Sequence, residues 1–201
     1  MTTLYKLTDQ NMQTYGGYQW VLGEERTTSG YGDLCGPGWL HAYTDPLLAV
    51  ILNPIHANYL TPKLFRADGE VGKTDHGLKV GCTKLVLTEE MKLPQVELHQ
   101  LVAFGILCAL EVYKDEKFIV WANSWISGAD RSYDAANAAW YAARDAARDA
   151  AIAYAADAAT NAAIAYANAA RDAARYAARY AAAEKPLDLI ALAHQAMETK
   201  P

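Results

Sequence analysis

The chain has 201 residues, 52% of them apolar, and a formal net charge of -5. This length suits one ordinary domain with an extension, or two small domains. The acidic balance gives no electrostatic footprint for nucleic acid, so we expect no nucleic-acid partner. Three cysteines (Cys35, Cys82 and Cys108) form no Cys-x-x-Cys pair, which argues against a zinc knuckle and against a secreted disulfide framework. We expect reduced thiols, a cytoplasmic location, no metal and no cofactor.

The sequence carries no pattern typical of a membrane protein. Met1 is followed by polar residues and not by the basic and apolar regions of a signal peptide. The most apolar stretch, Leu101 to Leu110, is about ten residues long, which is too short to span a bilayer. We therefore expect no membrane partner.

The first 94 residues favour short strands separated by turns. Alternating aromatic and aliphatic residues between glycine- and proline-rich turns are typical of strands. Asp45 followed by Pro46 predicts the start of a short helix that ends at Asn53 and Pro54. The expected strands are Thr3–Leu7, Tyr18–Leu22, Trp39–Tyr43, Pro62–Asp68 and Leu78–Leu87.

After Pro94 the pattern changes to helices. Gln95 to Val112 is apolar on nearly every side, which predicts a buried helix. Phe118 to Ile126 and Leu187 to Met197 predict two shorter helices. We therefore predict an α+β fold with two domains, an α+β ligand-binding domain at residues 1–128 and a helical oligomerisation arm at residues 129–201.

The alanine segment, Tyr133 to Ala183, dominates the second part. Of its residues 28 are alanine, and none is glycine or proline, so it should be helical. Unbroken, it would be about 75 Å long. Ser127 to Asp130 has the spacing of a capping box and predicts where the helix starts. The polar pair Thr160-Asn161 is where a bend would fall, so a continuous helix and a bent one both stay open.

A helix of alanine has little surface of its own to bury, so it should pack closely against a partner. We prefer association with other copies of the chain; the alternative is an arm that folds back on its own domain. Aromatic and isoleucine side chains along the helix are the candidate contacts. They are Trp140, Tyr141, Ile152, Tyr154, Ile164, Tyr166, Tyr176 and Tyr180.

Candidate chemistry gathers near the glycine-rich loop Gly30 to Gly38. Backbone N–H groups of such a loop could hold phosphate, although the spacing matches neither the dinucleotide nor the Walker pattern. Cys35 beside His41 could be a nucleophile pair; the alternative is a small buried thiol and a strand histidine. Aromatic, histidine and asparagine side chains suit stacking and edge recognition of a base-like ring. The candidate ligand-binding residues are Lys6, Tyr31, Trp39, His41, Tyr43, Asn53, His56 and Tyr59.

Several short motifs resemble an uncharacterised domain of bacteriophage and prophage proteins. They are Tyr5-Lys6, Trp20 to Glu24, Leu34 to Gly38, His41, Asp45-Pro46 and Gly69-Glu70, followed by Trp125 to Ser132 and the alanine blocks. The resemblance implies a viral origin, and hence the cytoplasm of a host cell. A fainter likeness to ADP-ribosyltransferase folds rests on Lys6, His41 and Tyr43. The sequence singles out no catalytic glutamate for such an enzyme, because Glu89, Glu90, Glu97 and Glu111 are equal candidates.

The leading hypothesis is a non-enzymatic, oligomeric phage protein that sequesters a nucleotide-derived immune signal of the host. One alternative is an ADP-ribosyltransferase-like or nucleotide-processing enzyme that uses His41 and Tyr43. Another is a structural or protein-binding helical module.

Overall fold

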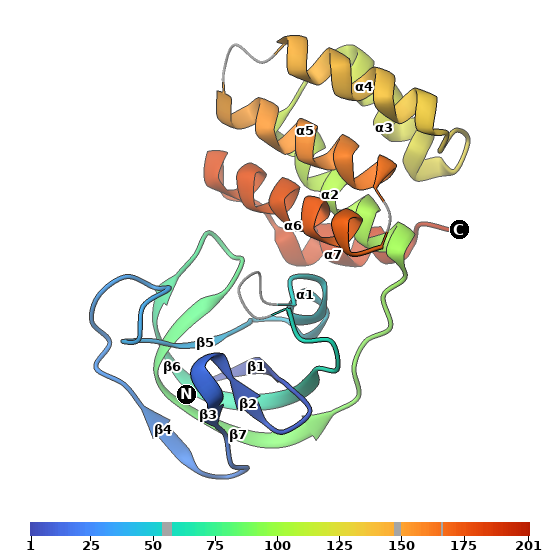
Figure 1. Cartoon of the computed structure of the whole chain (residues 1–201). Coiled ribbons are helices and arrows are strands. Elements are labelled where there is room, and N and C mark those ends of the chain that lie inside the picture. The colour runs from blue at the N-terminus through green and yellow to red at the C-terminus, as the bar shows by residue number, and fades with distance from the viewer. Residues whose placement is uncertain (54–57, 147–149, 166) are drawn as a thin grey trace. The chain divides into compact units, whose positions relative to one another are not determined.

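The computed structural model describes all residues except 54–57, 147–149 and 166, together with the side chains of all but 140–153, 166–169 and 171. The fold is α+β, with a sheet unit at Met1–Gln95 and a helical unit at Val96–Pro201 (Figure 1). We expected the boundary at Gly128. It falls earlier because the first two long helices after Pro94 pack with the alanine segment.

Four strands of the sheet unit, β1, β6, β7 and β5, form a ring of antiparallel pairs, while β2 and β3 form a separate two-stranded sheet. β1 pairs with β6, β6 with β7, and β7 with β4 and β5. Tyr43, just after β5, exchanges backbone hydrogen bonds of 2.9 and 2.8 Å with Tyr5 of β1, which closes the ring as in a small barrel. The strands are β1 (Thr2–Thr8), β2 (Gln13–Thr14), β3 (Tyr18–Gln19), β4 (Glu25–Thr27), β5 (Leu40–Ala42), β6 (Lys63–Thr74) and β7 (Val80–Met91).

Two long strands bend to make this closure possible. β6 and β7 pair along most of their length, and their register shifts at three places between Arg66 and Lys73. Such bulges bend a strand and increase its twist. The interior is apolar, with Leu4, Phe65 and Leu85 among its fully buried members.

The sequence predicted the small helix of this unit well. α1 (Pro46–Ile51) begins at Asp45, whose Oδ1 accepts a hydrogen bond of 2.9 Å from the Leu48 N–H, with Pro46 in the first helical position. The strand expected at Tyr18–Leu22 is shorter, because Trp20 turns into the core while Val21 and Leu22 are exposed.

The helical unit is built around α2, which is buried along most of its length and packs against α5, α6 and α7. A Cβ atom placed on Gly105 would lie 2.9 Å from Ala174 Cα of α6. The two helix backbones therefore approach as closely as glycine and alanine allow. The helices are α2 (Leu98–Val112), α3 (Glu116–Ser127), α4 (Tyr133–Ala146), α5 (Ala150–Ile164), α6 (Ala167–Glu184) and α7 (Leu189–Met197).

The alanine segment is not one continuous helix. It forms α4, α5 and α6 (Figure 1). α5 packs between α4 and α6, and α5 and α6 both pack against α2. No bend occurs at Thr160-Asn161, since both residues lie within α5. The Thr160 hydroxyl donates to the Ala156 and Asp157 carbonyls of the same helix, and Asn161 Nδ2 donates to the Asp157 carboxylate. Folding back lets alanine faces bury one another within a single chain.

The segment also starts later than expected. α3 ends at Ser127, and Gly128 follows it with φ +80°, a left-handed conformation that closes a helix. The Ser132 hydroxyl, and not that of Ser127, accepts a hydrogen bond of 3.3 Å from the Ala135 N–H in the first turn of α4. The capping box predicted at Ser127 is therefore wrong.

Candidate functional site

The glycine-rich loop of the sheet unit is tied down by its own backbone. The Gly30 N–H and the Thr28 hydroxyl both donate to the Gly38 carbonyl, at 3.0 and 2.8 Å, and Trp39 Nε1 donates to the Gly32 carbonyl at 3.0 Å. A Cβ atom on Gly38 would lie 2.0 Å from the Tyr31 carbonyl oxygen, so the two loop ends fit together only with glycine there. The loop is thus held in one shape.

Two lysines from the long hairpin reach this loop. Lys73 Nζ of β6 donates to the Gly32 carbonyl at 3.1 Å, and Lys79 Nζ, beside β7, donates to Cys35 Sγ at 3.3 Å. Tyr31 directly precedes Gly32 in the sequence and is 85% exposed. The cluster of Tyr31, Lys73 and Lys79, called here the Tyr31 cluster, presents a flat ring and two ammonium groups from a held backbone.

Lys6 lies inside the ring of strands. It shares a face of β1 with Leu4, because side chains two residues apart point the same way. Its Nζ donates to the His41 carbonyl at 2.6 Å and lies 5.1 Å from the centre of the Trp20 ring. Burial lowers the pKa of Lys6 to about 8; Cys82 opposes this shift and Lys79 adds to it.

His41 and Tyr43 belong to the same inner cluster. His41 Nε2 contacts the Leu34 carbonyl, and Tyr43 is buried where it pairs with β1. Lys6 thus contacts the His41 backbone, and Tyr43 pairs with Tyr5, the neighbour of Lys6, while the side chains of Lys6 and Tyr43 are both buried.

Asn53 and Tyr59 form another pair. Asn53 Nδ2 donates to the Tyr59 carbonyl at 2.9 Å, and Asn53 Oδ1 accepts from the Tyr59 N–H at 3.3 Å. Asn53 therefore ties two chain segments together through its side chain. Burial, with a smaller effect of Asp9, raises the pKa of the half-buried Tyr59 phenol to about 12. His56 lies outside the described residues.

In the described part of the chain, hydrogen bonds and ring contacts join the candidate ligand-binding residues in groups of two or three. These contacts do not bring them into one pocket. Trp39 belongs to the glycine-rich loop, where its ring covers Gly72 and Gly81 of the hairpin. Lys73 and Lys79 were missed from the sequence, because they lie 41 and 44 residues from their loop partners. The sequence did offer one signal for this pair: Lys73 and Lys79 lie near the Gly69 to Gly77 turn, and a hairpin brings the ends of its two strands together.

Tyrosines of the alanine segment form an outer cluster in the helical unit. The Tyr180 ring lies 5.4 Å from that of Tyr154 and 6.1 Å from that of Tyr176. Tyr154 is 53% and Tyr176 41% exposed, and Ile164 is half-buried. The side chains of the other expected contact residues lie outside the described ones. They are Trp140, Tyr141, Ile152 and Tyr166.

Within the described ranges, no three His, Cys, Asp or Glu side chains are placed to hold a metal ion. In the same part of the chain, no helix combines the length and apolar character needed to cross a bilayer. None of the three cysteines forms a disulfide.

Residues 2–99 match the model of a domain family of unknown function, DUF7666. The match covers the whole sheet unit and the first residues of α2. No curated protein and no solved structure matches the chain. The similarity to that family therefore lies in the sheet unit and the start of α2.

Proposed function

We propose that this chain is a non-enzymatic binding protein whose sheet unit holds an anionic, nucleotide-like ligand at the Tyr31 cluster. The observation that carries the proposal is an 85% exposed ring on a loop that is already held in shape. A loop ordered before binding loses little entropy when the ligand arrives. Stacking on Tyr31 would recognise a base, and the ammonium groups of Lys73 and Lys79 would recognise phosphate.

The inner cluster favours binding over turnover. Lys6 and Tyr43 are buried, and the Lys6 ammonium already donates to the His41 carbonyl. A nucleotide at the surface of the unit would meet the Tyr31 cluster before it met these groups. In the phage setting that the sequence resemblance implies, tight binding without turnover would sequester a signalling nucleotide of the host.

Association of several copies is part of the same proposal. The exposed rings of Tyr154 and Tyr176 support it, because clustered tyrosines are typical of protein interfaces. Each added copy would bring another Tyr31 cluster into the same assembly.

Calorimetry of the full chain against cyclic nucleotides and ADP-ribose tests the binding proposal. We expect Tyr31→Ala to weaken binding about fivefold or more, because stacking of a base on an aromatic ring contributes roughly 1–3 kcal/mol. Lys73→Gln should weaken binding and flatten its dependence on salt.

Tyr15→Ala is the matched control, because Tyr15 is 87% exposed in the same unit but lies outside the cluster. It should bind like the unaltered chain. A chain that binds no member of the panel, or binds equally after Tyr31→Ala, contradicts the proposal.

A further inference from the structure

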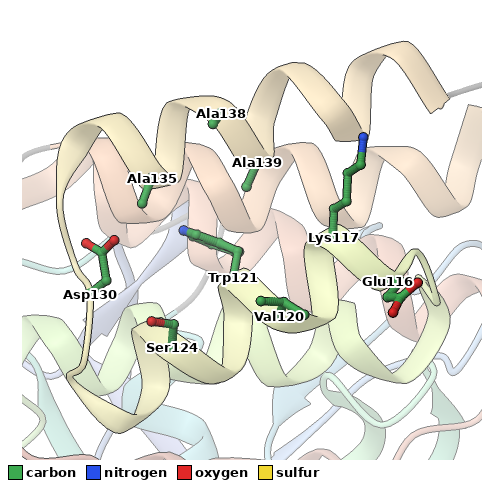
Figure 2. Close-up of a pocket in the computed structure, with 9 residues that line it drawn as sticks. All are labelled: Glu116, Lys117, Val120, Trp121, Ser124, Asp130, Ala135, Ala138 and Ala139. Atoms are coloured by element: carbon green, nitrogen blue, oxygen red, sulfur yellow. The ribbon is translucent and has the colours of Figure 1, made fainter.

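The helical unit contains a cavity of about 530 Å³ between α3 and α4 (Figure 2). Cavities of roughly 300–1,000 Å³ are the size that small-molecule ligands occupy. The described residues that line it belong to Glu116–Ala139, a pair of neighbouring helices and the turn between them.

The two helices face each other across the cavity with apolar side chains. On the α4 side these are Ala135, Ala138 and Ala139, and on the α3 side Val120 and the Trp121 ring (Figure 2). Alanine methyl groups leave a slot in which a planar ring can lie between the two helices.

The Trp121 indole places a polar N–H between the apolar walls of the slot. The side chain is only 7% exposed, and no acceptor among the described residues lies within hydrogen-bond distance of Nε1. A buried donor left without an acceptor costs about 1–3 kcal/mol. In Figure 2 the Nε1 edge of the ring points between the helices, toward the end where Asp130 lies. An occupant that offers an oxygen or nitrogen acceptor would satisfy this group.

The two ends of the slot differ in charge. Ser124 and Asp130 lie at one end, and Glu116 and Lys117 lie at the other (Figure 2). Hydrogen bonds from the side chain and then the backbone of Ser132 hold the pKa of Asp130 below its usual value, so its carboxylate stays charged. The Ser124 and Asp130 end, which has no cation among its lining residues, suits a positively charged group.

We propose that this cavity binds a small, planar aromatic amine. Its ring lies between the alanines of α4 and Trp121, an oxygen on the ring accepts from Trp121 Nε1, and its ammonium group lies at Asp130. This site is independent of the Tyr31 cluster, since its lining residues all belong to the helical unit.

Three related probes test the chemistry on the full chain. Tyramine carries a ring, a phenol oxygen and an ammonium group, and we expect it to bind and to shift the indole N–H resonance of Trp121. Phenethylamine lacks the phenol oxygen and should bind about five- to tenfold more weakly, the usual effect of one hydrogen bond. 3-(4-Hydroxyphenyl)propionate carries a carboxylate in place of the ammonium and should not bind detectably.

Variants separate this site from other sites on the chain. Trp121→Phe keeps the apolar ring and removes the donor, so tyramine and phenethylamine should then bind alike. Ala138→Leu adds bulk at an exposed position of the slot and should abolish binding without unfolding the helix. Asp130→Asn should weaken tyramine binding about tenfold or more, whereas Asp134→Asn, an exposed acid of α4 outside the lining, should not.

Circular dichroism of each variant shows whether α3 and α4 remain folded. Failure of tyramine to bind at millimolar concentration overturns the proposal, and so does equal binding of the propionate. A Trp121 resonance that responds to protein concentration, and not to tyramine, would show that a second copy covers the slot and would also overturn it.

Discussion

Lys6 is the side chain whose surroundings differ most from those usual for its type. Lysine is almost never fully buried unless it is paired. Here it is 7% exposed, and within the described part of the chain no carboxylate forms an ion pair with it. A backbone carbonyl and the face of Trp20 are its described partners. A charged Lys6 therefore destabilises the sheet unit.

This cost should appear as a dependence of stability on pH. The pKa of Lys6 is about 8 in the folded chain and roughly 10.4 when unfolded. Between these values the unfolded chain binds more protons, so the free energy of unfolding rises with pH. The free energy of unfolding of the unaltered chain, measured relative to that of Lys6→Met, should rise by up to about 1.4 kcal/mol per pH unit across this window. Below pH 7 this difference should not change with pH.

Urea unfolding at pH 7, 8, 9 and 10 measures this difference. Lys92→Met is the control, because Lys92 is exposed and has no such cost of burial. Its difference from the unaltered chain should not vary with pH. A constant difference for Lys6→Met as well would show that Lys6 is not held in a desolvated site.

The pairing of α2 with α6 depends on small side chains. Ala174 is fully buried, and its backbone meets α2 at Gly105. Helices that approach this closely leave no room for added methyl groups, and overpacking typically costs about 1–3 kcal/mol. A side chain larger than alanine at position 174 should therefore destabilise the crossing of the two helices.

Ala174→Val tests this crossing against a change of the same kind on the same helix. We expect Ala174→Val to lower the free energy of unfolding by about 2–3 kcal/mol, from overpacking together with the weaker helix propensity of valine. Ala183→Val, at an exposed position of α6, should cost only about 0.5 kcal/mol, from propensity alone. Equal losses in urea unfolding would mean that α2 and α6 are not closely packed there.

Elements with local signals could be predicted from the sequence, and their arrangement could not. Asp45-Pro46 marks the start of α1 because a cap acts within one turn. The breaks in the alanine segment have no such signal, since alanine favours helix equally at every position. The apolar pattern of α2 showed that it is buried, but not that α5 and α6 bury it.

The candidate site divides in the same way. Tyr31 and Trp39 could be singled out from a short stretch dense in aromatics and glycines. Lys73 and Lys79 join them only through the pairing of β6 with β7. In α3, Trp121 looks like any core aromatic until the missing acceptor for its N–H is seen.

At the scale of the whole molecule, the alanine faces are already in use. Alanines of α5 and α6, among them Ala156, Ala159, Ala177 and Ala181, are fully buried within one chain. An alanine seam between copies is therefore not needed to explain the composition. The exposed rings of the tyrosine cluster are what the alanine segment still offers to another copy.

We expect the full chain to associate through Tyr154 and Tyr176, because large apolar rings at an interface often carry much of its binding energy. Light scattering over a range of concentrations should give a mass above the 21.9 kDa of one chain. The double variant Tyr154→Ala, Tyr176→Ala should weaken association about tenfold or more, whereas Tyr133→Ala, at an exposed tyrosine of α4 outside the cluster, should not.

Point variants are preferable to truncation at Gly128, since losing α5 and α6 would expose α2. A full chain that stays monomeric at every concentration would contradict association altogether, and a double variant that associates normally would place the interface elsewhere.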